Sequence, residues 1–136
     1  IPYTTLFRSE QYKTTFEKYG LKNIFLITPQ TSEERIRFID SVSDGFIYMV
    51  SSASVTGSQT GFGSIQEGYF KRIADMNLKN PQIIGFGISN KETFNQATQF
   101  AKGAIIGSAF IQHLTKNGTG KIEGFVKEIR QTPSSR

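Results

Sequence analysis

The chain has 136 residues, no cysteine and a formal net charge of +5, with 16 Lys and Arg against 11 Asp and Glu. This length suits a single hydrophobic core, and the lack of cysteine excludes disulfides and thiolate metal sites, which fits a cytoplasmic protein. The basic residues are scattered among acidic ones and no segment has the length of an apolar membrane span. We therefore expect no nucleic-acid partner, no membrane partner and no bound metal.

The first nine residues differ from the rest of the chain. They show no amphipathic period, and all but the first resemble the in-frame translation of a sequencing-library adapter. We therefore expect an artefactual or disordered leader at 1–9, a folded region at 10–130 and a frayed polar tail at 131–136. The folded region begins with a predicted helix whose apolar positions are Tyr12, Phe16 and Tyr19.

Two strand–helix units are predicted next. Residues 24–27 form a short apolar run typical of a buried parallel strand. Thr31 and Glu34 have the spacing of a capping box for the following helix. The second strand is expected at 46–50 and its helix begins near Ile65. The side chains expected to face the core from the first helix are Ile36, Ile39 and Val42, and the second helix is expected to run from Ile65 through Phe70, Ile73 and Met76.

Two further units follow. Strands are expected at 83–86 and 104–106, the first leading to a helix capped by Ser89 with Glu92. A short helix at 109–114 is followed by a loop and a last helix. The helix after the strand at 83–86 is expected to carry Phe94, Ala97 and Ala101 inward, and the last helix bears Ile122, Phe125, Val126 and Ile129. Four such repeats without a hairpin signal predict an α/β fold with a parallel sheet and right-handed crossovers.

One connection is longer than the others. The predicted strands begin at Ile24, Phe46, Ile83 and Ala104, so the spacings are 22, 37 and 21 residues. The surplus lies in residues 51–63, which are small, polar and glycine-rich and follow the end of a strand. A long loop at this position predicts a mobile lid over an active site, with a plain flexible insertion as the alternative.

Two strand–turn–helix junctions share one pattern. Residues 85–89 and 106–109 each combine a glycine-bearing turn with a serine after an apolar run. Backbone N–H groups at such helix starts bind phosphate, and (β/α)8 barrels carry their usual phosphate site after strands seven and eight. The alternative is that Gly87 and Gly107 are only turn residues and Ser108 only a helix cap.

The motifs Tyr48-Met49-Val50-Ser51, Ser54-Val55-Thr56-Gly57, Gly85-Phe86-Gly87-Ile88-Ser89 and Gly107-Ser108-Ala109 resemble, in this order, those of the tryptophan synthase alpha subunit family. The resemblance implies a TIM-barrel (β/α)8 fold, of which residues 10–130 would be the C-terminal half with four parallel strands. It implies a carbon–carbon lyase of tryptophan biosynthesis that cleaves indole-3-glycerol phosphate to indole and glyceraldehyde 3-phosphate. It also implies a beta-subunit partner that carries pyridoxal phosphate, while this chain needs no cofactor.

The resemblance also assigns site residues. Thr56 matches a lid threonine that helps to order the catalytic carboxylate, and Ser52 stands where many members carry arginine. The residues matched to the phosphate are Gly57, Gly87, Gly107 and Ser108, and those matched to the rest of the substrate are Tyr48, Phe86 and Ile105.

The catalytic carboxylates are expected to be missing. The family supplies a glutamate and an aspartate from its second strand and the loop after it, and neither region is expected here. We therefore expect a fragment that is inactive alone and self-associates through two unpaired strand edges. Two alternatives stay open: a fragment of a related phosphate-sugar isomerase barrel, and a non-catalytic phosphate-binding half-barrel.

Overall fold

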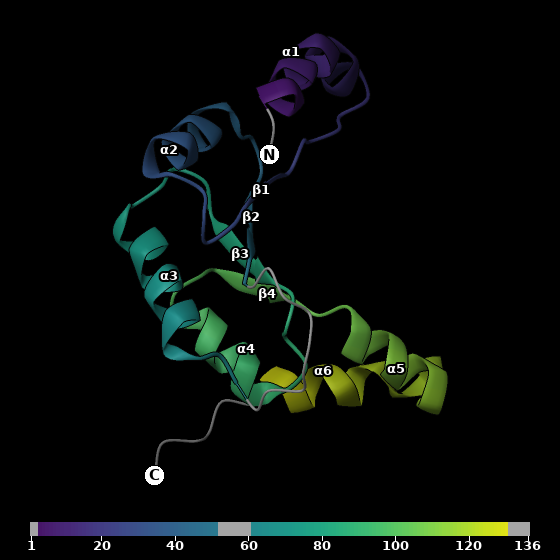
Figure 1. Cartoon of the computed structure of the whole chain (residues 1–136). Helices are drawn as coiled ribbons and strands as arrows, with labels where there is room; N and C mark the ends of the chain where they lie inside the picture. Colours follow the sequence, from purple (N-terminus) through teal and green to yellow (C-terminus); the bar gives the residue numbers. More distant parts are fainter. Residues whose placement is uncertain (1–2, 52–60, 131–136) are drawn as a thin grey trace.

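The structure is a computed structural model that describes the backbone of residues 3–51 and 61–130 and, within these ranges, the side chains from residue 10 onward. The described strands form one parallel sheet in the order β1-β2-β3-β4, with a helix between consecutive strands (Figure 1). The predicted parallel α/β sheet is therefore confirmed. The elements are α1 (Tyr3–Lys18), β1 (Phe25–Ile27), α2 (Glu33–Val42), β2 (Ile47–Val50), α3 (Ser64–Asp75), β3 (Gln82–Gly85), α4 (Lys91–Thr98), β4 (Gly103–Ile105), α5 (Ser108–Asn117), a 3-10 turn η1 (Thr119–Lys121) and α6 (Ile122–Arg130).

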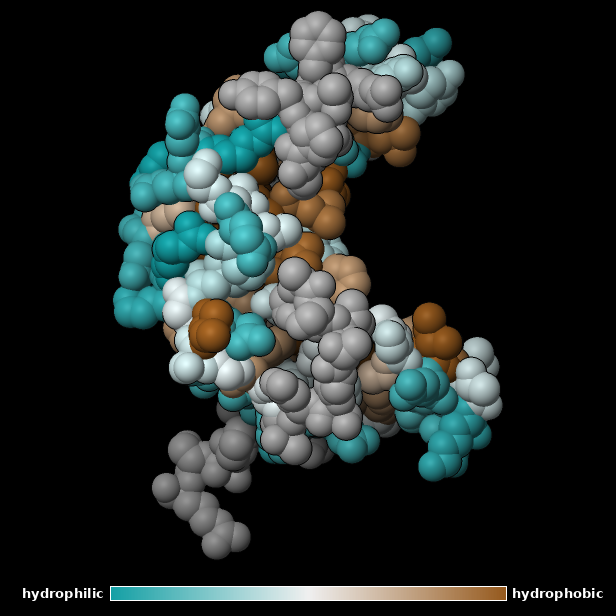
Figure 2. Space-filling model, in the orientation of Figure 1, coloured by the Kyte–Doolittle hydropathy of each residue, from teal (hydrophilic) through white to brown (hydrophobic). Residues whose placement is uncertain are grey.

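The sheet has one covered and one open face. Helices α2, α3 and α4 follow one another along the outer side of the strands, and the molecule curves into a crescent (Figures 1 and 2). Along β1 the side chains alternate: Phe25 and Ile27 are buried against the core, whereas Leu26 is 40% exposed. Because Leu26 pairs with Tyr48 in the parallel register, both side chains project to the open, inner face.

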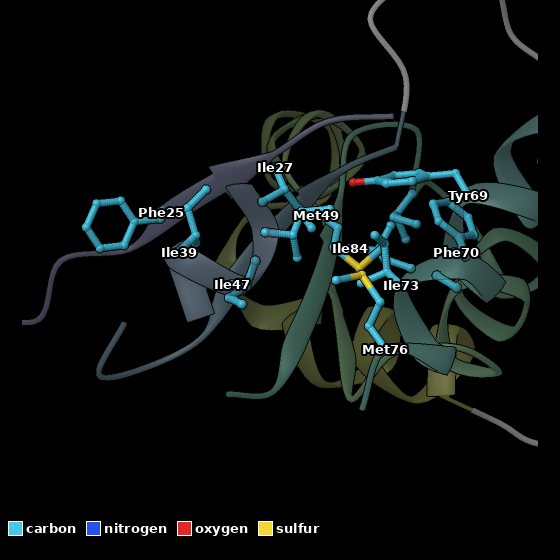
Figure 3. Close-up of a cluster of buried hydrophobic side chains, with 13 residues drawn as sticks. Phe25, Ile27, Ile39, Ile47, Met49, Tyr69, Phe70, Ile73, Met76 and Ile84 are labelled. Atoms are coloured by element: carbon cyan, nitrogen blue, oxygen red, sulfur yellow. The ribbon is translucent and has the colours of Figure 1, made fainter. Parts of the chain in front are cut away.

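The core lies between the sheet and its outer helices. Side chains from the strands meet those of α3, of which Phe70 and Ile73 are fully buried (Figure 3). The Phe70 ring also packs edge-on against Phe62, with the ring centroids 5.1 Å apart. This cluster contains the predicted core residues Ile36, Ile39 and Ala97, together with Phe70, Ile73 and Met76.

A polar network joins the end of α2 to the start of β3, at the amino ends of the strands. The Asp40 carboxylate accepts hydrogen bonds from the backbone N–H groups of Lys79 and Asn80, at 2.7 and 2.9 Å, and from the Asn80 amide at 2.8 Å. Burial alone would raise the pKa of Asp40, but these bonds outweigh it and lower the pKa below its ordinary value. The network therefore depends on the ionised carboxylate.

Two predicted helix caps are wrong. Ser32, not Thr31, caps α2 by accepting a hydrogen bond from the Arg35 N–H, while Thr31 Oγ1 accepts one from the Thr28 N–H in the preceding turn. At α4 the cap is Asn90 instead of Ser89. Its partner in a reciprocal capping box is Thr93, so Glu92 takes no part. Adjacent polar residues can each cap a helix, and the backbone entry angle decides between them.

One side chain predicted to face the core does not, because Val42 is exposed. Ile65 and Val126 are also exposed, the former at 83%, whereas Ile129 is buried. Phe94 and Ala101 are partly buried against the core. Val42 is the last residue of α2 and Ile65 the second residue of α3, so both lie at helix ends.

The helical boundaries also differ at both ends of the chain. Helix α1 begins at Tyr3, inside the segment expected to be a leader, and Tyr12 and Tyr19 are exposed. Helix α5 continues to Asn117, beyond the predicted end at Leu114. Within the described ranges, no helix is long and apolar enough to cross a membrane.

Candidate phosphate-binding site

The carboxyl ends of the last three strands meet at one edge of the sheet. Gly85 pairs with Val50 on one side and with Ile105 on the other, all in parallel register. The turns that follow β3 and β4 therefore leave the sheet side by side, as the two junctions predicted for phosphate require. Gly87, Gly107 and Ser108 are all exposed there.

The turn after β3 has an unusual backbone. Phe86 and Gly87 both have positive φ, at 66° and 76°. Glycine adopts this region freely, but an aromatic side chain does not, and such conformations gather at functional sites. The Ser51 hydroxyl donates a 2.6 Å hydrogen bond to the Phe86 carbonyl, which ties the end of β2 to this turn.

Tyr48 and Phe86 form the apolar wall beside the turn. Their rings meet edge to face, with centroids 6.0 Å apart, and Phe86 is 48% exposed. The Tyr48 ring lies over Gly85, where a Cβ atom would overlap its hydroxyl and ring carbons. Glycine at 85 is therefore required by this close approach. Burial raises the pKa of the Tyr48 hydroxyl above its ordinary value, so the group stays protonated at neutral pH.

The helix after β4 has an open amino terminus. Gly107 is its N-cap and offers no side-chain acceptor, and the first intrahelical bond runs from the Ile111 N–H to the Gly107 carbonyl. The N–H groups of Ser108, Ala109 and Phe110 therefore have no partner within the helix. Ser108 is the first helical residue, so its interpretation as the cap is wrong. Three donors without a partner in the described part of the chain, together with the positive end of a helix dipole, suit an anion.

A family model for the tryptophan synthase alpha chain matches residues 2–134. The chain belongs to this family. It is 77% identical over 122 residues to the tryptophan synthase alpha chain of Flavobacterium johnsoniae, covering 90% of this chain and 48% of that protein. It is 69% identical over 121 residues to that of Christiangramia forsetii, covering 89% and 47%. The chain thus spans about half the length of the curated relatives it matches.

Solved structures agree on the fold. The tryptophan synthase alpha subunit of Campylobacter jejuni superposes with a TM-score of 0.76 at 23% identity, covering 95% of this chain and 52% of that one. A chain of the tryptophan synthase a2b2 complex from Pyrococcus furiosus gives 0.74 at 28% identity, covering 90% and 51%. These neighbours are TIM barrels, and the four parallel strands form an α/β half-barrel, as predicted.

Part of the predicted site lies outside the described residues. This holds for Thr56, Gly57 and Ser52, and for most of the predicted lid. The described end of this loop is anchored: the Phe62 N–H donates to the Gln96 side chain at 3.0 Å, and the Phe62 ring lies 3.4 Å from where a Cβ on Gly87 would stand. The tryptophan synthase alpha motifs give no role to Phe62 or Gln96, which emerge only from the contacts.

None of the acidic residues of the chain lies in a strand or in the connection that follows one. All 11 acidic residues fall in helices, except Asp44 in the turn before β2, and none is in a strand. Of these, Glu33 pairs with Arg37 on α2 and Glu123 pairs with Lys127 on α6. In the described part of the chain, no three histidine or carboxylate side chains gather as a metal site would require.

Proposed function

We propose that this chain supplies the phosphate-binding half of a tryptophan synthase alpha chain. The whole enzyme would be a carbon–carbon lyase that cleaves indole-3-glycerol phosphate to indole and glyceraldehyde 3-phosphate, and its partner would be a beta subunit carrying pyridoxal phosphate. This chain would need no cofactor of its own. The observation that carries the proposal is the pairing of Gly85 with Ile105, which places both junctions at one edge.

Each proposed residue has a role that its position supports. The amide of Gly87 and the free N–H groups at the start of α5, including Ser108, would bind the phosphate. Phe86 and Tyr48 would contact the indole ring, because their rings form one apolar wall beside the turn. Ile105, which pairs with Gly85, would extend this wall toward β4.

The chain alone would bind without turnover. Cleavage needs a general acid–base group and a carboxylate that stabilises the protonated indole nitrogen. A carboxylate in that role would project from a strand end or the loop after it, and the acidic residues of this chain are all placed elsewhere. The carboxylates would therefore come from a part of the enzyme outside these residues.

Isothermal titration with sn-glycerol 3-phosphate tests the phosphate site, with glycerol as the uncharged control. The chain should bind the phosphate and not glycerol, and it should release no indole from indole-3-glycerol phosphate. Gly87→Ala should weaken binding about tenfold, because alanine at φ 76° is strained and its methyl group meets Phe62. Gly118→Ala is the matched control, since Gly118 also has positive φ, at 68°, but lies at the far end of α5. Equal loss in both variants, or indole release by the chain alone, would contradict the proposal.

We also propose that the isolated chain self-associates through its inner face and outer strand edges. In the described sheet, β1 and β4 each pair on one side only. A hollow of about 560 Å³ opens beside β1, and its apolar lining comes from Leu26, Phe38 and Ile39. Leu26 and Phe38 are exposed, and apolar side chains line the inner curve of the crescent (Figure 2). Open apolar edges of this kind pair with other chains.

Sedimentation velocity at micromolar concentration tests the self-association. The chain should sediment as a dimer or larger species, and Leu26→Lys should shift it toward monomer by placing a charge on the edge strand. Ile65→Lys is the control, because Ile65 is more exposed but lies on helix α3 and not on a strand. A chain that sediments as a monomer and melts cooperatively would refute the proposal.

A further inference from the structure

Ser51 connects the end of β2 to the turn after β3. Its side chain is only 1% exposed, and its hydroxyl donates to the Phe86 carbonyl at 2.6 Å. Its backbone N–H donates to the Gly85 carbonyl at 3.1 Å. One buried residue thus bonds to two successive carbonyl groups at the point where β3 turns out of the sheet.

The turn needs such a support. Phe86 has φ of 66°, a conformation that a bulky side chain keeps only where its surroundings determine it. Packing supplies little of this support, because Phe86 is half exposed and its ring meets Tyr48 only edge to face. The hydrogen bond from Ser51 holds the carbonyl of the peptide group that joins Phe86 to Gly87.

The geometry of this peptide group also sets the direction of the Gly87 N–H group. The Phe86 carbonyl and the Gly87 N–H belong to the same peptide unit, which is planar and trans, so the two groups point in opposite directions. Holding the carbonyl toward the buried Ser51 hydroxyl therefore turns the Gly87 N–H away from the protein interior. That is the amide assigned above to the phosphate.

We propose that Ser51 is a positioning residue for phosphate binding: its hydrogen bond to Phe86 aims the Gly87 amide at the phosphate. This inference rests on the proposed function, since the ligand is the phosphate of that site. Ser51 itself is buried and does not touch the ligand. Its removal should leave the fold intact and misdirect one amide.

The chain contains a matched control. Ser43 is also buried, at 3% exposure, and its hydroxyl donates a 2.7 Å hydrogen bond to the Ile39 carbonyl at the end of α2. The two serines therefore lose equivalent hydrogen bonds on replacement by alanine. Only Ser51 contacts the turn that bears the phosphate amide, so stability and binding can be separated.

The test compares Ser51→Ala with Ser43→Ala in two measurements. Titration with sn-glycerol 3-phosphate should show about a fivefold higher Kd for Ser51→Ala, equal to ~1 kcal/mol, and no change for Ser43→Ala. Without ligand, the HN–Hα coupling of Phe86 in the ¹⁵N-labelled chain should change for Ser51→Ala alone. Should Ser51→Ala fail to fold, Ser51→Cys replaces it, because the thiol fills the site but is a weak donor.

The outcomes separate this inference from the proposed function. An unchanged Kd and an unchanged Phe86 coupling in the Ser51 variant would overturn the positioning role while leaving the phosphate site standing. Absence of phosphate binding by the unaltered chain would overturn the proposed function, and with it the role of Ser51 in binding. A Kd that rises equally for both serine variants would mean that stability alone is involved, which also refutes the inference.

Discussion

Gly85→Ala tests whether the packing of Tyr48 requires a residue without a side chain at position 85. A Cβ at position 85 would overlap three atoms of the Tyr48 ring. The ring cannot give way at its tip alone, so it must rotate off the sheet and lose its edge-to-face contact with Phe86. Overpacking costs about 1–3 kcal/mol and the ring contact about 0.5–1.5 kcal/mol, so the free energy of unfolding should fall by about 2–4 kcal/mol.

Urea unfolding at a fixed low chain concentration measures this loss. With a slope of about 2 kcal/mol per molar urea, the midpoint should fall by about 1–2 M. Gly68→Ala is the control: nothing lies within 4 Å of its added methyl group in α3, and it should raise stability by about 0.5–1 kcal/mol. In a Tyr48→Ala background, Gly85→Ala should cost almost nothing, which gives a coupling energy of about 2–4 kcal/mol. An equal cost in both backgrounds would refute the steric reasoning.

Two further predictions concern stability. Asp40→Ala should lower the free energy of unfolding at pH 7 by about 2 kcal/mol, because it leaves the N–H groups of Lys79 and Asn80 without their acceptor. The pKa of Asp40 is lower in the folded than in the unfolded chain, so its contribution to stability is present above about pH 4 and is lost as the pH falls through the folded-state pKa. The free energies of unfolding measured with urea at pH 7 and pH 3 should therefore differ less for the variant than for the unaltered chain. An unchanged pH dependence, or an equal effect of replacing the exposed Asp44, would contradict this. Tyr69→Phe should raise the free energy of unfolding by about 1 kcal/mol and the melting temperature with it, because the buried Tyr69 hydroxyl has no hydrogen-bond partner among the described residues. A lower melting temperature for the variant would refute this.

The strands and their parallel order could be predicted from the sequence because short apolar runs between helical patterns have few other solutions. The runs 24–27 and 46–50 each place β-branched and aromatic residues where a strand is buried. The helix caps were less predictable. Thr31 and Ser32 are adjacent and chemically equivalent, and only the path of the chain out of β1 selects Ser32.

Some residues of the candidate site could also be predicted from the sequence, and others could not. Glycine and serine at the two junctions are visible in the sequence, because phosphate sites use few residue types in a short span. The supporting residues Ser51, Phe62 and Gln96 are not, since each acts through a partner about 30 or more positions away. Ser51 is the first of several serines in its segment, and nothing in its local sequence indicates that its side chain is buried.

The two junctions are not equivalent, although their sequences look alike. At the start of α4, the N–H groups of Ser89 and Asn90 donate to the Thr93 hydroxyl, and the Thr93 N–H donates to Asn90. These donors are already paired, so this helix end has less to offer an anion than its sequence predicts. At α5 the cap is glycine and the first turn stays open. The phosphate would therefore depend on a helix terminus at β4 and on a single strained turn at β3, which explains why the β3 turn alone needs a buried hydroxyl to set its direction.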